Sequence, residues 1–165
     1  MSSAASDFDV IFSALEQRKV RYLVVGGVAV VLHGYPRSTA ALDLVIDLEP
    51  ANVTAAMDAL TALGYRPRAP VPAMEFADPV KRHEWLAEKG LVMFSWWSPE
   101  HPATEVDLFV AEPFPFEPAC QRATRVALGP IAVPVAAIPD LIRLKEQAGR
   151  PKDRDDILAQ GGGGG

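Results

Sequence analysis

The chain has 165 residues, of which 49% are hydrophobic and 22% are charged, and its formal net charge is −5. This length fits one domain, and the apolar content is enough to form a buried core. The acidic balance argues against broad, nonspecific binding of nucleic acid, which depends on positive charge, but it leaves room for a local basic pocket.

The sequence also limits where the protein acts. No apolar run reaches the roughly 18 residues that a membrane-spanning helix needs. The N-terminal sequence MSSAASDFDV has neither a basic start nor an apolar middle, so we expect no secretory signal. The single cysteine, Cys120, excludes an internal disulfide and a cysteine zinc site. We therefore expect a cytoplasmic protein.

Apolar periodicity predicts alternating helices and strands in the first half of the chain. The predicted elements are a helix over 7–18, a buried strand over 20–25, a short helix over 28–33, a strand over 42–48 and a helix from Pro50 to Gly64. A proline-rich loop over 65–76 follows. The next helix, over 79–89, is expected to bury Val80, Trp85 and Leu86.

The second half continues in the same way. The predicted elements are strands over 91–97 and 105–110, a helix over 116–123, a hairpin of 126–128 and 131–135, and helices over 138–148 and 152–160. This mixture favours an α/β or α+β fold: a small mixed sheet flanked by helices, with C-terminal helices. We assign residues 1–160 to one domain. Residues 161–165 are all glycine and cannot pack, so they form a linker, a tag or unassigned residues.

Two predicted strands each carry an aspartate among apolar residues: Asp43 in LDLVID and Asp107 in EVDLFV. Either residue alone could simply face water at a strand end. Two such strands side by side would bring the carboxylates together, and close carboxylates repel unless a cation or a proton bridges them. Oxygen ligands of this kind suit Mg²⁺, which also takes substrate phosphates as ligands.

Two further motifs have the chemistry of phosphate binding. Gly26-Gly27, between a predicted strand and a helix, allows the backbone to approach a ligand closely, although a tight turn explains the pair equally well. Arg37, Ser38 and Thr39 provide a guanidinium and two hydroxyls for phosphate oxygens, although a solvated turn is the simpler explanation for this triplet.

Other residues with functional chemistry have simpler explanations. Trp96 and Trp97 could stack a base, but packing at the end of a strand is the more usual role. Lys81, Arg82 and His83 could form a basic edge for an acceptor, but a solvated helix face is the simpler interpretation.

Taken in order, Gly26-Gly27, the segment Arg37-x-Thr39-x-x-Leu42-Asp43 and Val106-Asp107-Leu108 resemble the nucleotidyltransferase-fold superfamily. The likeness is greatest to small bacterial proteins of the minimal nucleotidyltransferase and abortive-infection toxin-like groups. Their typical pattern is G-G or G-S, a short helix, R-x-T-x-D-[IL]-D, and a third Asp on a later strand. The C-terminal segment around Lys145 is also similar to their helical signature, and the likeness covers most of residues 20–160.

The resemblance implies Mg²⁺-dependent transfer of a nucleoside monophosphate from an NTP such as ATP, with release of pyrophosphate. In that family the carboxylates hold two Mg²⁺ ions, which stabilise the attacking and the leaving oxygens. Carried over to this chain, Asp43 and Asp107 would be the second and third metal-binding carboxylates. The positions implied to contact the nucleotide are Gly26, Gly27, Arg37, Ser38, Thr39 and Lys145.

The first carboxylate of the family pattern falls on Ala41, which has no ligand atom. Asp43 and Asp107 alone would bind one ion weakly, and the second metal site would be badly damaged. Asp47 shares the strand face but lies roughly 13 Å from position 43, so it cannot replace the missing neighbour.

Three explanations of Ala41 are open. The chain is an engineered variant of an active enzyme in which alanine replaces a ligand aspartate, a natural pseudoenzyme that binds a nucleotide or a partner, or a protein whose likeness is structural only. We favour the first, because the sequence around the gap is intact.

The resemblance implies a toxin–antitoxin or defence setting, in which the acceptor is a hydroxyl of a protein, such as a cognate toxin, or a tRNA 3′ end. Antibiotic nucleotidyltransferases have a similar arrangement of arginine and aspartates, so a drug hydroxyl is an alternative acceptor. Ala41 favours a further alternative, a non-catalytic antitoxin module that binds a nucleotide or a partner.

Overall fold

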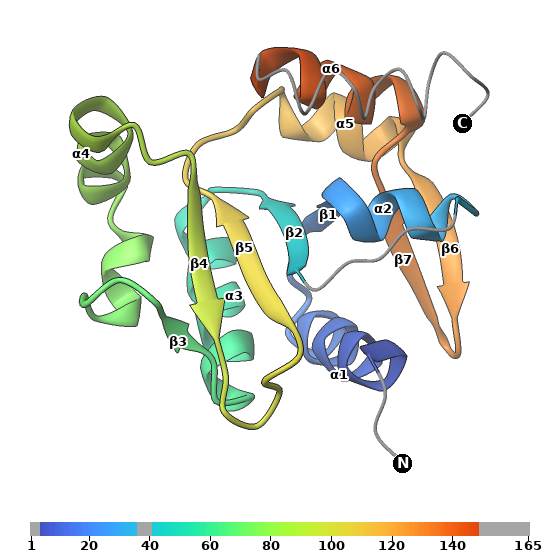
Figure 1. Ribbon diagram of the computed structural model, residues 1–165, viewed down its shortest axis with the longest axis horizontal. Helices are drawn as coiled ribbons and strands as arrows, with labels where there is room; N and C mark the ends of the chain where they lie inside the picture. The colour runs from blue at the N-terminus through green and yellow to red at the C-terminus, as the bar shows by residue number, and fades with distance from the viewer. Residues whose placement is uncertain (1–3, 36–40, 149–165) are drawn as a thin grey trace.

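The computed structural model describes residues 4–35 and 41–148, and these residues form a mixed β-sheet covered by helices (Figure 1). The described part of the sheet has seven strands in the order β3-β4-β5-β2-β1-β7-β6. Their bounds are β1 Tyr22–Val25, β2 Ala41–Ile46, β3 Arg66–Pro67, β4 Met93–Trp97, β5 Glu105–Phe109, β6 Thr124–Leu128 and β7 Ile131–Val135.

The helices of the described residues agree in order with those predicted. They are α1 Ala4–Gln17, α2 Gly26–Leu32, α3 Pro50–Ala62, α4 Pro79–Lys89, α5 Phe116–Arg122 and α6 Ile138–Ala148, with a 3₁₀ helix, η1, at Ala73–Ala77. None of them is both long and apolar enough to cross a bilayer. The predicted helix over 152–160 and the glycine tail lie outside the described residues.

The strand directions make the sheet mixed, as predicted. β1 pairs antiparallel with β2 and parallel with β7, and β2 pairs parallel with β5. The pairs β3–β4, β4–β5 and β6–β7 are antiparallel. Strands β2 and β5 need a long crossover because they are parallel, and the segment between them contains α3, η1 and α4. The short strand β3 and the helix η1 fall in the stretch predicted to be a loop.

Strand β1 is buried on both faces and separates two hydrophobic clusters. Tyr22 and Val24 belong to the larger cluster, which includes residues of α1 and α3, whereas Leu23 and Val25 belong to a smaller one beneath α5 and α6. Successive side chains of a strand point to opposite faces, so the two clusters lie on opposite sides of the sheet. Burial on both sides explains the uninterrupted apolar run YLVV.

Helix α4 is less buried than its sequence predicted. Trp85 is buried and stacks on Phe94 with ring centroids 4.7 Å apart, but Val80 is 62% exposed and Leu86 is 38% exposed. Arg82, predicted to be solvated, is instead buried and donates a hydrogen bond to the carbonyl oxygen of Phe76 at 2.5 Å. The helix therefore packs through Trp85 and Arg82, because η1 offers the guanidinium a backbone acceptor.

Helices α5 and α6 lie side by side at the top of Figure 1, and a buried carboxylate of α6 links them. Asp140 in the first turn of α6 is 0% exposed and accepts two hydrogen bonds from Arg122 of α5, from Nε at 3.0 Å and from Nη2 at 2.8 Å. Arg143 approaches the same carboxylate at 3.5 Å from within α6. A bidentate arginine fixes geometry better than a single contact does, so Arg122 sets the position of α6.

This difference between the two arginines can be tested. We expect Arg122→Gln to lower the urea midpoint of unfolding clearly, since Asp140 then loses its bidentate donor in a buried position. Arg143→Gln is the matched control, because it removes the same charge from the same carboxylate but only the longer contact, and we expect it to change the midpoint little. Equal losses in the two variants would contradict the role given to Arg122.

Candidate active site

The two aspartates singled out in the sequence lie side by side in the sheet. Strand pairing aligns Asp43 of β2 with Asp107 of β5, which runs parallel to it. The same row continues to Ser95 of β4 on one side and to Val25 of β1 on the other. Neighbouring strands are about 4.8 Å apart, so the register places two carboxylates next to each other, directly before the strand–helix junction at Gly26.

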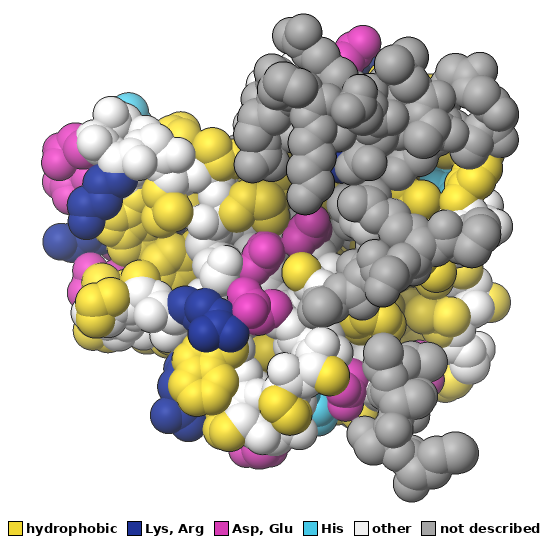
Figure 2. All heavy atoms as spheres, viewed as in Figure 1, with side chains coloured by type: hydrophobic (Ala, Val, Ile, Leu, Met, Phe, Trp, Pro, Cys, Tyr) yellow, Lys and Arg dark blue, Asp and Glu magenta, His cyan; other side chains and the backbone are white. Residues whose placement is uncertain are grey.

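This pair of carboxylates lies on the face of the sheet that α5 and α6 cover. The neighbouring residues Leu42, Leu44, Val106 and Leu108 are buried in the larger cluster on the opposite face. Asp43 and Asp107 are only half-buried. Figure 2 shows acidic side chains gathered near the middle of the viewed face, next to basic ones.

Asp107 is the more constrained of the two aspartates. Burial raises the pKa of its carboxyl above the usual value, and the charge of Glu105 adds to the rise, while a hydrogen bond with Ser95, the charge of Arg68 and a hydrogen bond with Asp43 lower it. Its Oδ1 atom is buried and has no hydrogen-bond partner. A buried, unpartnered carboxylate oxygen beside a second carboxylate is a fitting ligand for a cation.

The residues present therefore fit a divalent cation at Asp43 and Asp107, the pair that the sequence indicated. The pair is not a complete cage: among residues 4–35 and 41–148, no three His, Cys, Asp or Glu side chains are grouped closely enough to hold a metal. Ala41, at the position of the expected first ligand, lies two residues before Asp43 on the same strand face and contributes only a methyl group.

Two features require glycine at position 26: the conformation of the backbone and the closeness of Asp43. Its φ is +69°, a conformation that side chains disfavour, and a Cβ built there would lie 2.2 Å from Oδ2 of Asp43. The sequence left a phosphate contact and a tight turn as equal explanations of Gly26, and the positive φ together with the contact to Asp43 supports the tight turn. Gly27 is the second residue of α2, a helix of seven residues.

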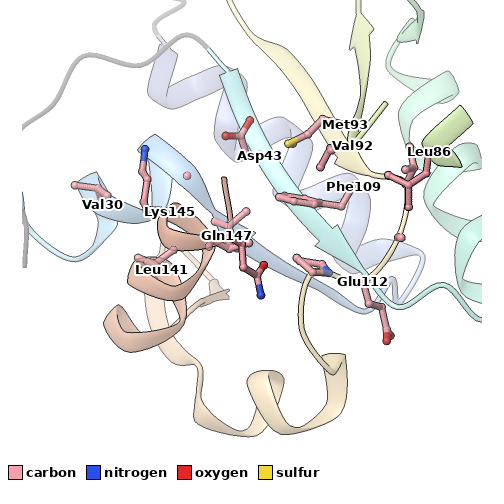
Figure 3. Close-up of a pocket in the computed structure, with 16 residues that line it drawn as sticks. Val30, Asp43, Leu86, Val92, Met93, Phe109, Glu112, Leu141, Lys145 and Gln147 are labelled. Atoms are coloured by element: carbon pink, nitrogen blue, oxygen red, sulfur yellow. The ribbon is translucent and has the colours of Figure 1, made fainter. Parts of the chain in front are cut away.

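A cavity of about 680 Å³ opens beside Asp43 (Figure 3). It lies between the sheet and α6, so that Lys145 of α6 and Asp43 of β2 line the same space. Its walls are mainly apolar, with the ring of Phe109 across the middle in Figure 3. The polar side chains that line it are Asp43, Glu112, Lys145 and Gln147.

The sequence prediction of the site was incomplete. Asp43, Gly26 and Lys145 line the cavity, but the predicted Arg37, Ser38 and Thr39 fall outside the described residues. Glu112 and Phe109 were not considered. Phe109 ends the strand that carries Asp107, and Glu112 follows soon after it. These positions could have indicated the site, because ligands of open α/β sheets bind at the C-terminal ends of strands.

The contact between Gly26 and Asp43 predicts a specific loss of stability. Gly90 is the matched control: its φ is +63°, and a Cβ there would meet nothing within 4 Å. We expect Gly90→Ala to cost about 1–2 kcal/mol of unfolding free energy, from the left-handed backbone alone. Gly26→Ala should cost a further ~1–3 kcal/mol, because the new methyl group must displace Asp43.

Urea unfolding measures both losses, and a second background separates their causes. Asp43→Ala removes the two nearest atoms and leaves only the Cβ of residue 43, at 3.0 Å, so most of the extra cost of Gly26→Ala over Gly90→Ala should disappear. An unchanged cost in that background would show that Asp43 is not what excludes a side chain at position 26.

Comparison with known protein families finds no match, and comparison with curated proteins finds none either. Solved structures do match. A proposed nucleotidyltransferase of Thermotoga maritima, TM1012, has 10% identity and a TM-score of 0.56, over 93% of this chain and 89% of that one. The antibiotic-resistance factor ANT(2″)-Ia was matched in two structures. Its crystal structure in complex with adenylyl-2″-tobramycin has 14% identity to this chain and a TM-score of 0.60, over 98% of this chain and 91% of that one. Its solution structure has 14% identity and a TM-score of 0.55, over 84% and 67%. The chain thus has the fold of nucleotidyltransferases, as its motifs predicted.

Proposed function

We propose that this fold serves Mg²⁺-dependent transfer of a nucleoside monophosphate from an NTP to a hydroxyl of a protein or a tRNA, with release of pyrophosphate. The present chain is impaired in that reaction because position 41 is alanine. The observation that carries the proposal is the in-register pair of Asp43 and Asp107, of which Asp43 contacts Gly26 and lines the cavity.

The metal-binding role falls on the two carboxylates. Asp43 and Asp107 would hold Mg²⁺, and the unpartnered Oδ1 of Asp107 is the atom best explained by such a ligand. When bound, the metal supplies positive charge that stabilises the developing charge on the phosphate oxygens. Burial is the main cause of the raised pKa of Asp107, so a bound cation would favour the charged form of this carboxylate.

The remaining residues would bind and orient the nucleotide. The absence of a side chain at Gly26 lets Asp43 lie flat against the backbone and lets phosphate approach the α2 junction. Lys145 reaches the same cavity from α6, where its ammonium group would attract the triphosphate. The apolar walls would exclude water from the reacting groups. Gly27, Arg37, Ser38 and Thr39 retain the nucleotide-binding roles that the resemblance implies.

Ala41 supports a second candidate from another class, a non-catalytic antitoxin module that binds a nucleotide or a partner. Both candidates use the same fold and cavity, and they differ only in whether the metal site is completed. Either would suit a toxin–antitoxin or defence system in the cytoplasm.

The likeness to ANT(2″)-Ia raises a drug hydroxyl as a third candidate acceptor. The lining of the cavity argues against a polycationic drug such as tobramycin, because among the described residues that line it only Asp43 and Glu112 contribute carboxylates to mainly apolar walls. Several amines need several acidic partners when they leave water. We therefore place the protein or tRNA acceptor first.

Transfer of label from each of the four NTPs, labelled at the α-phosphate, into total cell protein and RNA tests the proposal. The chain is compared with Ala41→Asp in the presence of Mg²⁺. We expect Ala41→Asp to label a discrete protein or RNA band and the present chain to label it about 100-fold less or weaker still, because the present chain lacks a carboxylate that would hold the charge-stabilising metal. EDTA should abolish the labelling.

Two variants in the Ala41→Asp background serve as controls. Adding Asp43→Asn should remove the label, whereas adding Asp58→Asn, an exposed aspartate on α3, should leave it unchanged. If Ala41→Asp labels nothing while both proteins still bind NTP, the non-catalytic candidate replaces the enzyme. Labelling of an added aminoglycoside alone would favour the drug acceptor.

A further inference from the structure

The register of β2 and β5 places a third acidic residue next to the gap at position 41. Ala41 is paired with Glu105, two residues before the pair of Asp43 and Asp107. Alternation along both strands puts all four side chains on the same face. Glu105 therefore lies next to the position at which Ala41 provides no carboxylate. Sequence spacing alone did not connect these two residues.

The carboxylate of Glu105 forms an ion pair with an arginine. Its Oε2 accepts a hydrogen bond from Nη2 of Arg68 at 2.8 Å, and the two side chains are 37% and 55% exposed. Exposed ion pairs of this kind contribute little to stability. Exchanging Arg68 for a divalent cation as the partner of Glu105 would therefore cost little folding free energy.

Both partners of this ion pair lie within electrostatic reach of the metal-binding pair. Glu105 lies on the same strand and the same face as Asp107, and Arg68 is bonded to Glu105. Arg68 thus supplies positive charge near the carboxylates from an exposed position at their edge.

We propose that Glu105 provides, from β5, the carboxylate that Ala41 lacks on β2, so that a divalent cation at Asp43 and Asp107 gains a third acidic ligand. Glutamate has one methylene group more than aspartate, which gives it reach toward the cation. In the structure Glu105 pairs with Arg68, and no three acidic side chains of the described residues are grouped closely enough to hold a metal, so the proposal requires Glu105 to exchange Arg68 for the cation. The inference rests on the proposed function only for the place of the cation.

Binding of Mn²⁺ to the purified full chain without nucleotide tests this role directly, with the signal of unbound Mn²⁺ in electron paramagnetic resonance as the readout. We expect Glu105→Gln to weaken Mn²⁺ binding by about tenfold or more, as Asp43→Asn and Asp107→Asn do. Glu88→Gln removes the same charge from an exposed position on α4 and should leave binding unchanged. Arg68→Gln should strengthen binding, because it removes the competing cation. Urea unfolding of each variant verifies that it is folded.

The Ala41→Asp background shows whether Glu105 replaces the missing ligand. With an aspartate restored on β2, Mn²⁺ should bind more tightly, and Glu105→Gln should then cost less than it does in the present chain. The inference is overturned if Glu105→Gln leaves Mn²⁺ affinity unchanged, if its cost is the same in both backgrounds, or if only Ala41→Asp binds Mn²⁺.

The outcome is separable from that of the proposed function. Weakened Mn²⁺ binding in Glu105→Gln, without any nucleotidyl transfer by Ala41→Asp, would keep Glu105 as a metal ligand and reject the enzyme. Transfer by Ala41→Asp with no effect of Glu105→Gln on Mn²⁺ would keep the enzyme and reject the role of Glu105.

Discussion

The parallel pairing of β2 with β5 is the constraint on which the site depends. It aligns Asp43 with Asp107 and, two residues earlier, Ala41 with Glu105. A shift of β5 by one residue would turn Asp107 and Glu105 into the hydrophobic core beneath, and a shift of β2 would do the same to Asp43. Either shift is prevented by Leu42, Leu44, Val106 and Leu108, which are buried on the other face. The hydrophobic core therefore determines where the charges lie.

Placing like charges next to each other lowers the stability of the fold. Asp107 is partly buried beside Asp43 and leaves one oxygen without a donor, an arrangement that an ordinary surface would avoid. Arg68 offsets part of the repulsion from the rim, through its ion pair with Glu105. The electrostatic balance is thus local: carboxylates at the centre, one arginine at the edge, and one lysine across the cavity on α6.

The sequence predicted the parts of this architecture whose pattern is local. The helices around Trp85 and from Pro50, the strands bearing Asp43 and Asp107, and the mixed sheet all follow from apolar periodicity and from glycine or proline at the ends. The burial of Arg82 was missed, because its acceptor belongs to η1. The proximity of Glu105 to Ala41 was missed as well, because strand order and register arise from packing across the whole chain. The cavity is also nonlocal, since its walls come from both halves of the sequence.

This origin of the cavity has a consequence for synthesis of the protein. Both aspartates have been made once β5 is complete. The second edge of β1 is covered later, when β7 has been made, and the cavity gains its α6 wall later still. A chain emerging from the ribosome thus contains its acidic residues well before it has a space that can enclose a ligand. Building the ligand chamber last would therefore delay binding of a ligand until most of the chain has been translated.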